Sequence, residues 1–279
     1  MDEKKLTVLS YDLRKDVLDI IMAGKGGHIG GDMSVLDTLI TLYFTQMNIT
    51  PDRLEDPDRD LFVLSKGHSV EAYYAVLAKK GFLDLEEIKQ KFSKFGSPYI
   101  GHPNNKLSGI EMNSGSLGHG LPVCVGMALA GKMDHRKYRV YTVMGDGELA
   151  EGSVWEAAMA ASQYQLDNLC AVVDRNQLQI SGTTEQVMGH EDLAARWQAF
   201  GWNVIVVENG NSIGQLYHAF ETAKTVKGKP TVLIAKTVKG FGSPVMENKV
   251  QWHHKVPTES EYQQIVIDFE ARKREVEYE

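Results

Sequence analysis

One glycine-rich turn of this sequence carries an acid in a place where phosphate-binding turns usually have none. Gly145-Asp146-Gly147-Glu148 follows the apolar run 138–144 and precedes a helical pattern. Glycines in a strand-to-helix turn let the backbone approach a ligand, and the free N–H groups of the following helix attract anions. Asp146 would repel a phosphate unless a divalent cation lay between them, and magnesium is typically held by one or two protein oxygens plus phosphate oxygens. The turn therefore predicts a metal-bridged phosphate site.

A second oxygen ligand lies on the loop after the next apolar run. Asn176 follows Asp146 by about 30 residues, and the backbone carbonyl of Leu178 is close to it in sequence. Carboxylate, amide and carbonyl oxygens are the ligands that magnesium prefers. We expect Asp146, Asn176 and Leu178 to hold the metal.

A nicotinamide-binding fingerprint is the alternative for the same turn. The residues from Gly145 to Ala150 fit the variant G-x-G-x-x-A, and Asp174 ends the next apolar run, where an acid would bind the ribose. Against this alternative, Asp146 and Glu148 would place two negative charges beside a pyrophosphate that has no metal.

Histidines are concentrated in irregular segments, which carry function more often than regular ones. Four lie in glycine-flanked loops and two form a pair: His28, His68, His102, His119 and His253-His254. A zinc site is disfavoured because they lack the close spacing of H-E-x-x-H, and because Cys124 and Cys170 lie in apolar runs typical of buried thiols. The pattern favours imidazoles that donate hydrogen bonds to anions and move protons near neutral pH.

The helix expected after the glycine-rich turn carries two further acids. Glu151 and Glu156 occur in ELAEGSVWEAAMA, where Glu156 lies on an otherwise apolar surface. A glutamate in that position is either paired or part of an interface. An ordinary exposed glutamate remains the alternative.

The elements that must position these residues alternate between strands and helices, which is the pattern of a parallel sheet covered on both faces. We expect strands at 61–64, 138–144, 169–174, 202–207 and 231–237 and helices at 6–21, about 34–47, 121–133, 153–165, 191–200, 212–227 and 258–279, with a further helix after 65–68. Asp32 or Ser34 is the expected cap of the second helix. Segments 81–120 and 238–257 are predicted to have irregular backbone structure. The fold class is α/β, a doubly wound and mostly parallel sheet in a single domain, 1–279.

The unusual residues fall just beyond the expected strand ends. Lys66 follows the first strand, Asp146 the second, Asn176 the third and Lys239 the last. In open α/β sheets this edge is where ligands bind. We expect one site along one edge of the sheet.

Composition narrows the function further. The 279 residues include 30 Lys+Arg, 37 Asp+Glu and 2 Cys, for a formal net charge of -7. A net negative charge disfavours binding to nucleic acids or anionic membranes. No signal-like segment and no run of about 20 apolar residues is present, so a cytoplasmic protein is expected.

Taken together, the motifs resemble the N-terminal, diphosphate-binding domain of the transketolase family of thiamine diphosphate enzymes. The resemblance runs from about residue 6 to residue 257 and is carried by GGHIGGDMS, FVLSKGH, GHPNNKLSGIEMNSGSLGHGL, VMGDGELAEGSVWEA, DRNQLQISG, AKTVKGFG and QWHHKVP. The GDG motif followed by an asparagine is general to thiamine diphosphate enzymes, whereas the histidine segments are specific to transketolases.

The resemblance implies a role for each matching position. The metal would be held by Asp146, Asn176 and the Leu178 carbonyl. It would be magnesium, or calcium or manganese in place of magnesium. The cofactor would be bound by His68, Gly115, Ser116, Leu117, Gly147, Glu148, Asn176, Lys239 and His253. Catalytic contacts with the sugars would come from His28, His102 and His253, with Lys255 nearby. Glu151 and Glu156 match acids that meet their counterparts across a dimer interface.

Three positions depart from the family pattern. His119 stands where many members have glutamine, His254 where glycine is usual, and Ile29 where proline is frequent. The role of His119, and the division of labour between His253 and His254, are therefore not given by the resemblance.

The resemblance also implies that part of the enzyme lies on another chain. A full-length transketolase continues into a pyrimidine-binding domain with the glutamate that activates the cofactor, and the similarity ends before that domain. We therefore expect the N-terminal subunit of a heteromeric transketolase, which transfers a two-carbon ketol group from a ketose to an aldose, often as phosphates. The expected assembly is a heterotetramer of two such chains and two partner chains that carry the activating glutamate.

Alternatives within and outside this chemistry remain. A subunit of a 2-oxo acid dehydrogenase would not need the sugar-facing histidines, and a deoxyxylulose phosphate synthase is usually one long chain. A non-catalytic scaffold would have no reason to retain a metal site. The donor and acceptor sugars are not indicated by the sequence.

Overall fold

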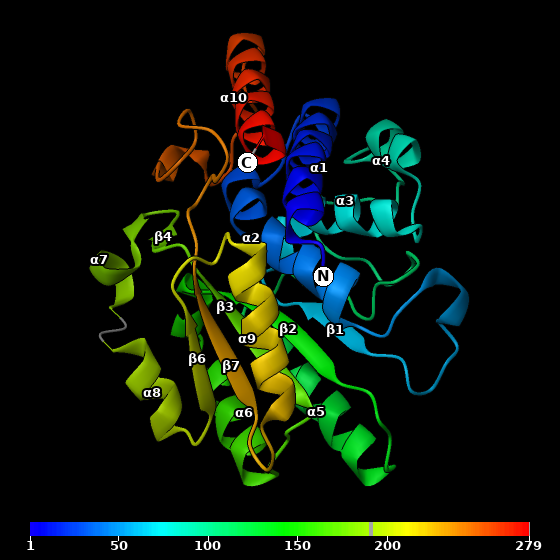
Figure 1. Ribbon diagram of the computed structural model, residues 1–279, viewed down its shortest axis with the longest axis vertical. Helices are drawn as coiled ribbons and strands as arrows, with labels where there is room; N and C mark the ends of the chain where they lie inside the picture. The colour runs from blue at the N-terminus through cyan, green and yellow to red at the C-terminus, as the bar shows by residue number, and fades with distance from the viewer. Residues whose placement is uncertain (190–191, 279) are drawn as a thin grey trace.

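A single five-stranded sheet forms the centre of the molecule. The computed structural model describes residues 1–189 and 192–278, and Figure 1 shows the sheet with helices on both sides. All neighbouring strands are parallel, in the order β1-β2-β3-β7-β6. The strands are β1 Leu61–Leu64, β2 Val140–Gly145, β3 Leu169–Arg175, β6 Asn203–Val207 and β7 Thr231–Lys236. The predicted α/β class and the five expected strands are confirmed.

Both faces of the sheet are buried, which explains why its strands read as continuous apolar runs. Along β3, Cys170 and Val172 pack in one core with α1, α2, α3 and α9, whereas Leu169, Ala171 and Val173 pack in the other with α5, α6 and α8. Successive side chains point to opposite faces of a strand, so an apolar residue is required at every position.

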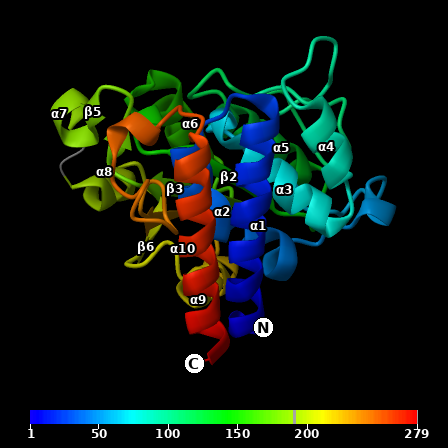
Figure 2. The ribbon, with the colours of Figure 1, turned by 90° about the horizontal axis from the view of Figure 1, so that it is seen from above.

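The helices largely follow the expected pattern. They are α1 Glu3–Gly24, α2 Ile29–Thr41, α3 Val70–Lys80, α4 Leu85–Lys91, α5 Gly120–Met133, α6 Gly152–Gln163, α7 Thr184–Met188, α8 Leu193–Ala199, α9 Ile213–Thr225 and α10 Glu259–Tyr278. Figure 2 shows α10 running beside α1, and these helices pack through Ile265 and Phe269 of α10. No described helix has the length and apolar character needed to span a bilayer.

Two local expectations were wrong. Segment 81–120 contains α4, whose LEEIKQK sequence buries only Ile88 and so gives almost no periodic signal. Helix α2 begins at Ile29, five residues earlier than expected, with His28 as its N-cap and without a side-chain cap. Asp32 and Ser34 are buried inside the helix and bond elsewhere.

Three additional short elements surround the site. A two-stranded antiparallel hairpin, β4 Leu178–Gln179 and β5 Gly182–Thr183, follows Asn176 and leads into α7. The expected helix 191–200 corresponds to α8. Residue 191, the first of that expected helix, and residue 279, the last of the expected helix 258–279, lie outside the described residues.

Strand register brings the distant motifs together. Gly145 pairs with Asp174, and Asp174 pairs with Ala235 on the other side. The loops that start at Lys66, Asp146, Asn176 and Thr237 therefore leave from the same edge. The structure thus brings these motifs to one edge of the sheet, as expected.

Candidate functional site

A cavity of about 300 Å³ opens at this carboxyl edge. It is lined by most of the predicted site residues and by several others: His28, Lys66, His68, Gly115, Leu117, Gly145, Asp146, Gly147, Glu148, Asn176, Leu178, Gln179, Ile180, Ser181, Lys239 and His253. Ser116 is exposed outside the cavity, and His102 lies behind Gly115, where a Cβ on Gly115 would be 2.5 Å from the His102 ring.

The three candidate metal ligands lie together on one wall. Asp146 Oδ1 accepts a hydrogen bond from the Gly147 N–H at 2.9 Å, and its Oδ2 accepts one from the Gln177 N–H at 2.5 Å. Asn176 Oδ1 faces the Leu178 backbone, from which it accepts a hydrogen bond at 3.2 Å. Burial, and next the neighbouring Asp174 carboxylate, raise the pKa of Asp146 to about 6. A divalent cation would relieve both effects, so this donor set fits a hard metal ion.

Asp174 organises the floor of the cavity. Its Oδ2 accepts hydrogen bonds from Lys66 Nζ at 2.5 Å, Ser34 Oγ at 2.6 Å and Asn176 Nδ2 at 3.1 Å, and its Oδ1 accepts one from Thr237. Although burial opposes ionisation, Lys66 and these donors hold the pKa of Asp174 below its usual value. Because these hydrogen bonds occupy both oxygens of Asp174, this residue cannot serve as the ribose acid of a dinucleotide site.

The roles of Asp174, Ser34 and Thr237 in this floor were missed by sequence reasoning, which weighed Asp174 only as a ribose acid. The available signal was position at the end of a buried strand, since Asp174 is the second-last residue of β3 and Thr237 directly follows β7. Ser34 lies 140 residues from Asp174 in the chain, and no local pattern connects the two.

Lys239 is a buried cation without a carboxylate partner among the described residues. Its side chain is 2% exposed, and its ammonium group donates to the Leu178 carbonyl oxygen at 3.2 Å. Burial, and next the charge of Lys66, lower the pKa of Lys239 to about 8. A buried ammonium group is stabilised by an anion, so the cavity is electrostatically suited to a phosphate.

Glu148 accepts hydrogen bonds from three separate chain segments, at Ser65, Gly118 and Gly145. Its Oε1 accepts from the Gly118 N–H at 2.9 Å and from the Ser65 hydroxyl, and its Oε2 accepts from the Gly145 N–H at 3.0 Å. Both carboxylate oxygens are thereby occupied. Glu148 shapes the cavity by fixing its walls.

Four of the predicted histidines gather around His28. Ring centroids lie 4.6 Å from His28 for His254, 5.3 Å for His68, 5.8 Å for His253 and 6.3 Å for His102. Burial first, and then neighbouring cationic groups, lower the pKa of His28 to about 4 and that of His253 to about 3. Burial also lowers the pKa of His68 and His102. His28, His68, His102 and His253 are therefore neutral at physiological pH, and their imidazoles can both donate and accept hydrogen bonds.

Lys255 is expected near the sugars, and the role of His119 is left open by the resemblance. Lys255 forms an ion pair with Glu261 and lies 4.1 Å from the Trp252 ring centroid. His119 is exposed and contacts Ser116 Oγ and the Leu117 carbonyl, each at 3.2 Å. Neither residue lines the cavity.

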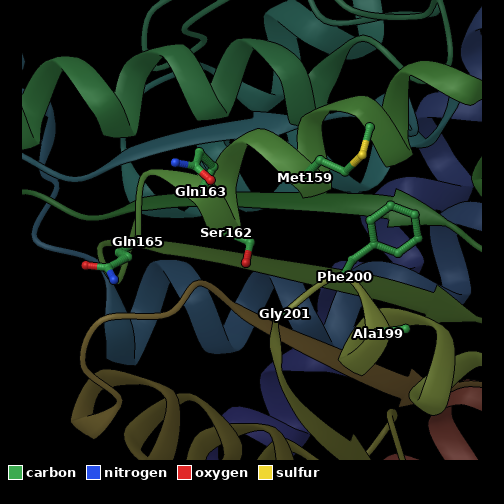
Figure 3. A pocket seen from close by; sticks show the side chains of 7 residues that line it. All are labelled: Met159, Ser162, Gln163, Gln165, Ala199, Phe200 and Gly201. Carbon is green, nitrogen blue, oxygen red and sulfur yellow. The ribbon is translucent and has the colours of Figure 1, made fainter.

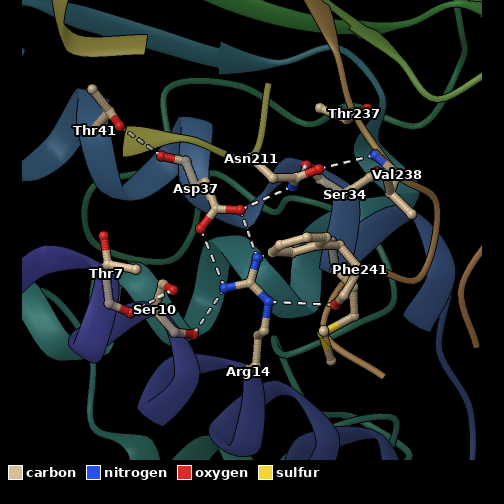
Figure 4. A network of polar contacts seen from close by, with 12 residues as sticks. Thr7, Ser10, Arg14, Ser34, Asp37, Thr41, Asn211, Thr237, Val238 and Phe241 are labelled. Atoms are coloured by element: carbon tan, nitrogen blue, oxygen red, sulfur yellow. Dashed lines mark hydrogen bonds and ion pairs between the residues drawn. The ribbon is translucent and has the colours of Figure 1, made fainter. Parts of the chain in front are cut away.

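A buried ion-pair network holds the loop that carries Lys239 (Figure 4). Arg14 is fully buried and pairs with Asp37 at 2.6 Å, while its Nε donates to the Phe241 carbonyl at 3.4 Å. Asn211 donates to Asp37 at 2.9 Å and accepts from the Val238 N–H at 2.9 Å. Helices α1 and α2 thus fix both ends of the 238–241 segment.

Glu151 and Glu156 are exposed, and neither forms an ion pair with any described residue. Helices α5 and α6 also carry exposed apolar side chains, including Val123, Met133 and Met159, which are 37%, 70% and 55% exposed. The combination of unpaired acids and apolar residues fits the interface role that the resemblance implies.

A second hollow lies away from this chemistry. It measures about 620 Å³ and is bounded by the ends of α6 and α8, with Met159 and Phe200 towards one end and Gln163 and Gln165 towards the other (Figure 3). It has no charged lining side chain, so it offers nothing for a phosphate or a metal.

Comparison with known proteins agrees with the geometry. Residues 7–272 match the family described as "Transketolase, thiamine diphosphate binding domain". The chain belongs to this family.

Two relatives and one solved structure define its place in the family. The chain is 47% identical to an apulose-4-phosphate transketolase subunit of Phocaeicola vulgatus, over 100% of this chain and 99% of that protein. It is 40% identical to a 6-deoxy-6-sulfo-D-fructose transketolase subunit of Clostridium sp., over 92% and 94%. It superimposes on the transketolase of Leishmania mexicana with a TM-score of 0.85 and 26% identity, covering all of this chain but 45% of that one. In extent, the chain therefore corresponds to the subunits of split transketolases.

Proposed function

We propose that this chain is the N-terminal, thiamine diphosphate-binding subunit of a heteromeric transketolase that acts in the cytoplasm with a divalent cation. Its relatives of similar length are named as subunits of transketolases that act on different sugars. Ketol transfer is what those names share, so the proposal covers the reaction and not a particular ketose or aldose.

The observation that carries the proposal is a buried ammonium group beside a buried set of oxygen donors in one cavity. The Lys239 ammonium has no carboxylate partner among the described residues, and Asp146 lies close enough to the Asp174 carboxylate for its pKa to be raised, although Arg175 Nη1 is 3.8 Å from Asp146 Oδ2. A diphosphate bridged to a divalent metal would place an anion beside Lys239 and a cation beside the two carboxylates. Asp146, Asn176 and the Leu178 carbonyl would hold the metal, and Lys239, His68 and Gly147 would contact the diphosphate.

Thiamine diphosphate, when bound, supplies a nucleophilic carbon and an electron sink for breaking the carbon–carbon bond of the ketose. The chain's own contribution is a set of neutral imidazoles around the reacting sugar. His28 and His253 each keep a buried Nδ1 without a hydrogen-bond partner. These nitrogens can accept a proton from a sugar hydroxyl or return one to a carbonyl oxygen, with His102 beside them.

The partner would supply the group that activates the cofactor. We assign the activating glutamate to a second chain that closes the cavity, and self-association to the α5 and α6 surface with Glu151 and Glu156. Two copies of each chain would then form a heterotetramer.

Calorimetric titration of thiamine diphosphate into the complex with the partner subunit tests the proposal. Binding is expected only with magnesium, and Lys239→Met is expected to weaken it by about 10–100-fold, because a charge-assisted contact is lost. Lys255→Met is the matched control, since Lys255 pairs with Glu261 outside the cavity, and should bind normally. Magnesium-independent binding, or equal losses in the two variants, would contradict the site. Ketol transfer by the chain without its partner would contradict the division of the enzyme into two chains.

A further inference from the structure

Two carboxyl groups outside the cavity are buried against each other behind His28. Asp32 lies on α2 and Glu71 in the first turn of α3, and both are 0% exposed. Asp32 Oδ1 accepts a hydrogen bond from the Ala72 N–H at 3.0 Å and so caps α3 from a neighbouring helix. If both groups were ionised, Asp32 Oδ2 and both oxygens of Glu71 would have no hydrogen-bond donor.

No cation among the described residues neutralises this pair. The charge of Lys66 acts on Asp32, but its ammonium is already held by Asp174 at 2.5 Å and by the Gly31 carbonyl at 3.1 Å. Tyr74, which also lies near Glu71, donates its hydroxyl to the Ile100 carbonyl at 3.0 Å. The backbone N–H groups of His28 and Glu71 lower the pKa of Glu71, yet neither is positioned to form a hydrogen bond with its oxygens, so the geometry favours a proton held between the two carboxyl groups.

Burial raises the pKa of both acids. The Asp32 carboxylate raises the pKa of Glu71 further, well above its usual range, whereas hydrogen bonding from the Ala72 N–H and from Glu71 opposes the effect of burial on Asp32. Two neighbouring carboxylates in an apolar site cannot both stay ionised, and one shared proton resolves the conflict. That proton also supplies the hydrogen bond that the unpartnered oxygens lack.

The pair lies against the backbone that presents His28 and His68. A Cβ on Gly27 would be 2.6 Å from Glu71 Oε1, so Glu71 packs directly under the turn that leads into His28. His28 caps α2, and His68 lies in the 3-10 turn Gly67–Ser69 that precedes α3. Because Asp32 is on α2 and Glu71 on α3, a hydrogen bond between them sets the position of one histidine relative to the other.

We propose that Asp32 and Glu71 share one proton and act as a positioning pair that holds His28 against His68. The shared proton is a property of this chain alone, whereas its effect on turnover rests on the function proposed above. Neither residue lines the cavity, so this role is distinct from binding of the cofactor or the metal.

Infrared difference spectroscopy in H₂O and D₂O tests the shared proton without any need for activity. The folded chain at neutral pH should show the carbonyl band of a protonated buried carboxylic acid. Glu71→Gln and Asp32→Asn should each remove it, since an amide hydrogen replaces the shared proton. Asp60→Asn is the control, because the Asp60 carboxylate is also buried but accepts backbone hydrogen bonds from Asn48 at 2.8 Å and Arg139 at 2.7 Å. A missing band, or a band that survives in both variants, overturns the shared proton.

Steady-state kinetics of the complex with the partner tests the positioning role. Glu71→Ala should lower kcat by about 10–100-fold with little change in thiamine diphosphate affinity, since misplaced catalytic groups cost rate more than binding. Glu71→Gln should restore most of the rate, because its amide can donate to Asp32. Equal rates for the alanine and wild-type enzymes, or equal losses for alanine and glutamine, overturn the positioning role. A wild-type complex with the infrared band but no ketol transfer would refute the proposed function alone.

Discussion

Asp37→Ala should be among the most destabilising substitutions in this protein, although Asp37 lies outside the cavity. The Arg14 and Asp37 side chains are 0% and 2% exposed, and they pair at 2.6 Å between α1 and α2. Removing Asp37 leaves the Arg14 charge buried. The Ser10 and Met33 carbonyls still accept hydrogen bonds from Arg14, but neutral carbonyls do not cancel its charge.

Breaking one half of a buried ion pair typically costs about 3–5 kcal/mol. A domain is stable by about 5–15 kcal/mol, so about a fifth or more of the folding free energy would be lost. The exposed pair of Lys224 and Glu221 on α9, with side chains 32% and 45% exposed, is the matched control. Glu221→Ala should cost at most about 0.2–1 kcal/mol, because solvent screens exposed pairs.

Urea denaturation of the isolated chain measures both losses under the same conditions. The double substitution Arg14→Met with Asp37→Leu should recover more than half of the loss, since apolar replacement removes the uncompensated charge. If Asp37→Ala costs no more than Glu221→Ala, the buried pair does not stabilise the fold. If the double variant is as unstable as Asp37→Ala, packing and not charge accounts for the loss.

Three further outcomes follow from the site. Asp146→Ala should abolish magnesium-dependent thiamine diphosphate binding in titration calorimetry, whereas His102→Ala should mainly lower turnover; retained binding in the first variant would contradict the metal assignment. Gly115→Ala should destabilise the chain by about 1–3 kcal/mol in urea denaturation, because Gly115 has φ of +133° and a Cβ would meet the His102 ring; wild-type stability would show that the loop can relax. Cys124 and Cys170 should not react with a thiol reagent at pH 8 until the chain unfolds, because burial raises the pKa of each to about 12; reaction in the folded state would mean that the cores open readily.

Local sequence was sufficient for the sheet and for the centre of the site. Strands such as β3 are short apolar runs bounded by turn residues, and parallel pairing places their carboxyl ends at one edge whatever the details of packing. Asp146 and Asn176 follow two such strands, so their proximity could be predicted from position alone. By contrast, α4 has one buried residue, and its pattern is too weak to mark it as a helix.

What the sequence by itself determined is the type of sheet, the edge at which the candidate site lies, and the residues that follow each strand. These depend on periodicity and chain direction, which are local properties. Only the tertiary structure decided which buried charges meet. Arg14 and Asp37 are 23 residues apart, Lys66 and Asp174 are 108 apart, and Asp32 faces Glu71 from another helix. Such pairs form because packing excludes water from each charge and leaves a particular neighbour as its partner, and no local pattern specifies that neighbour.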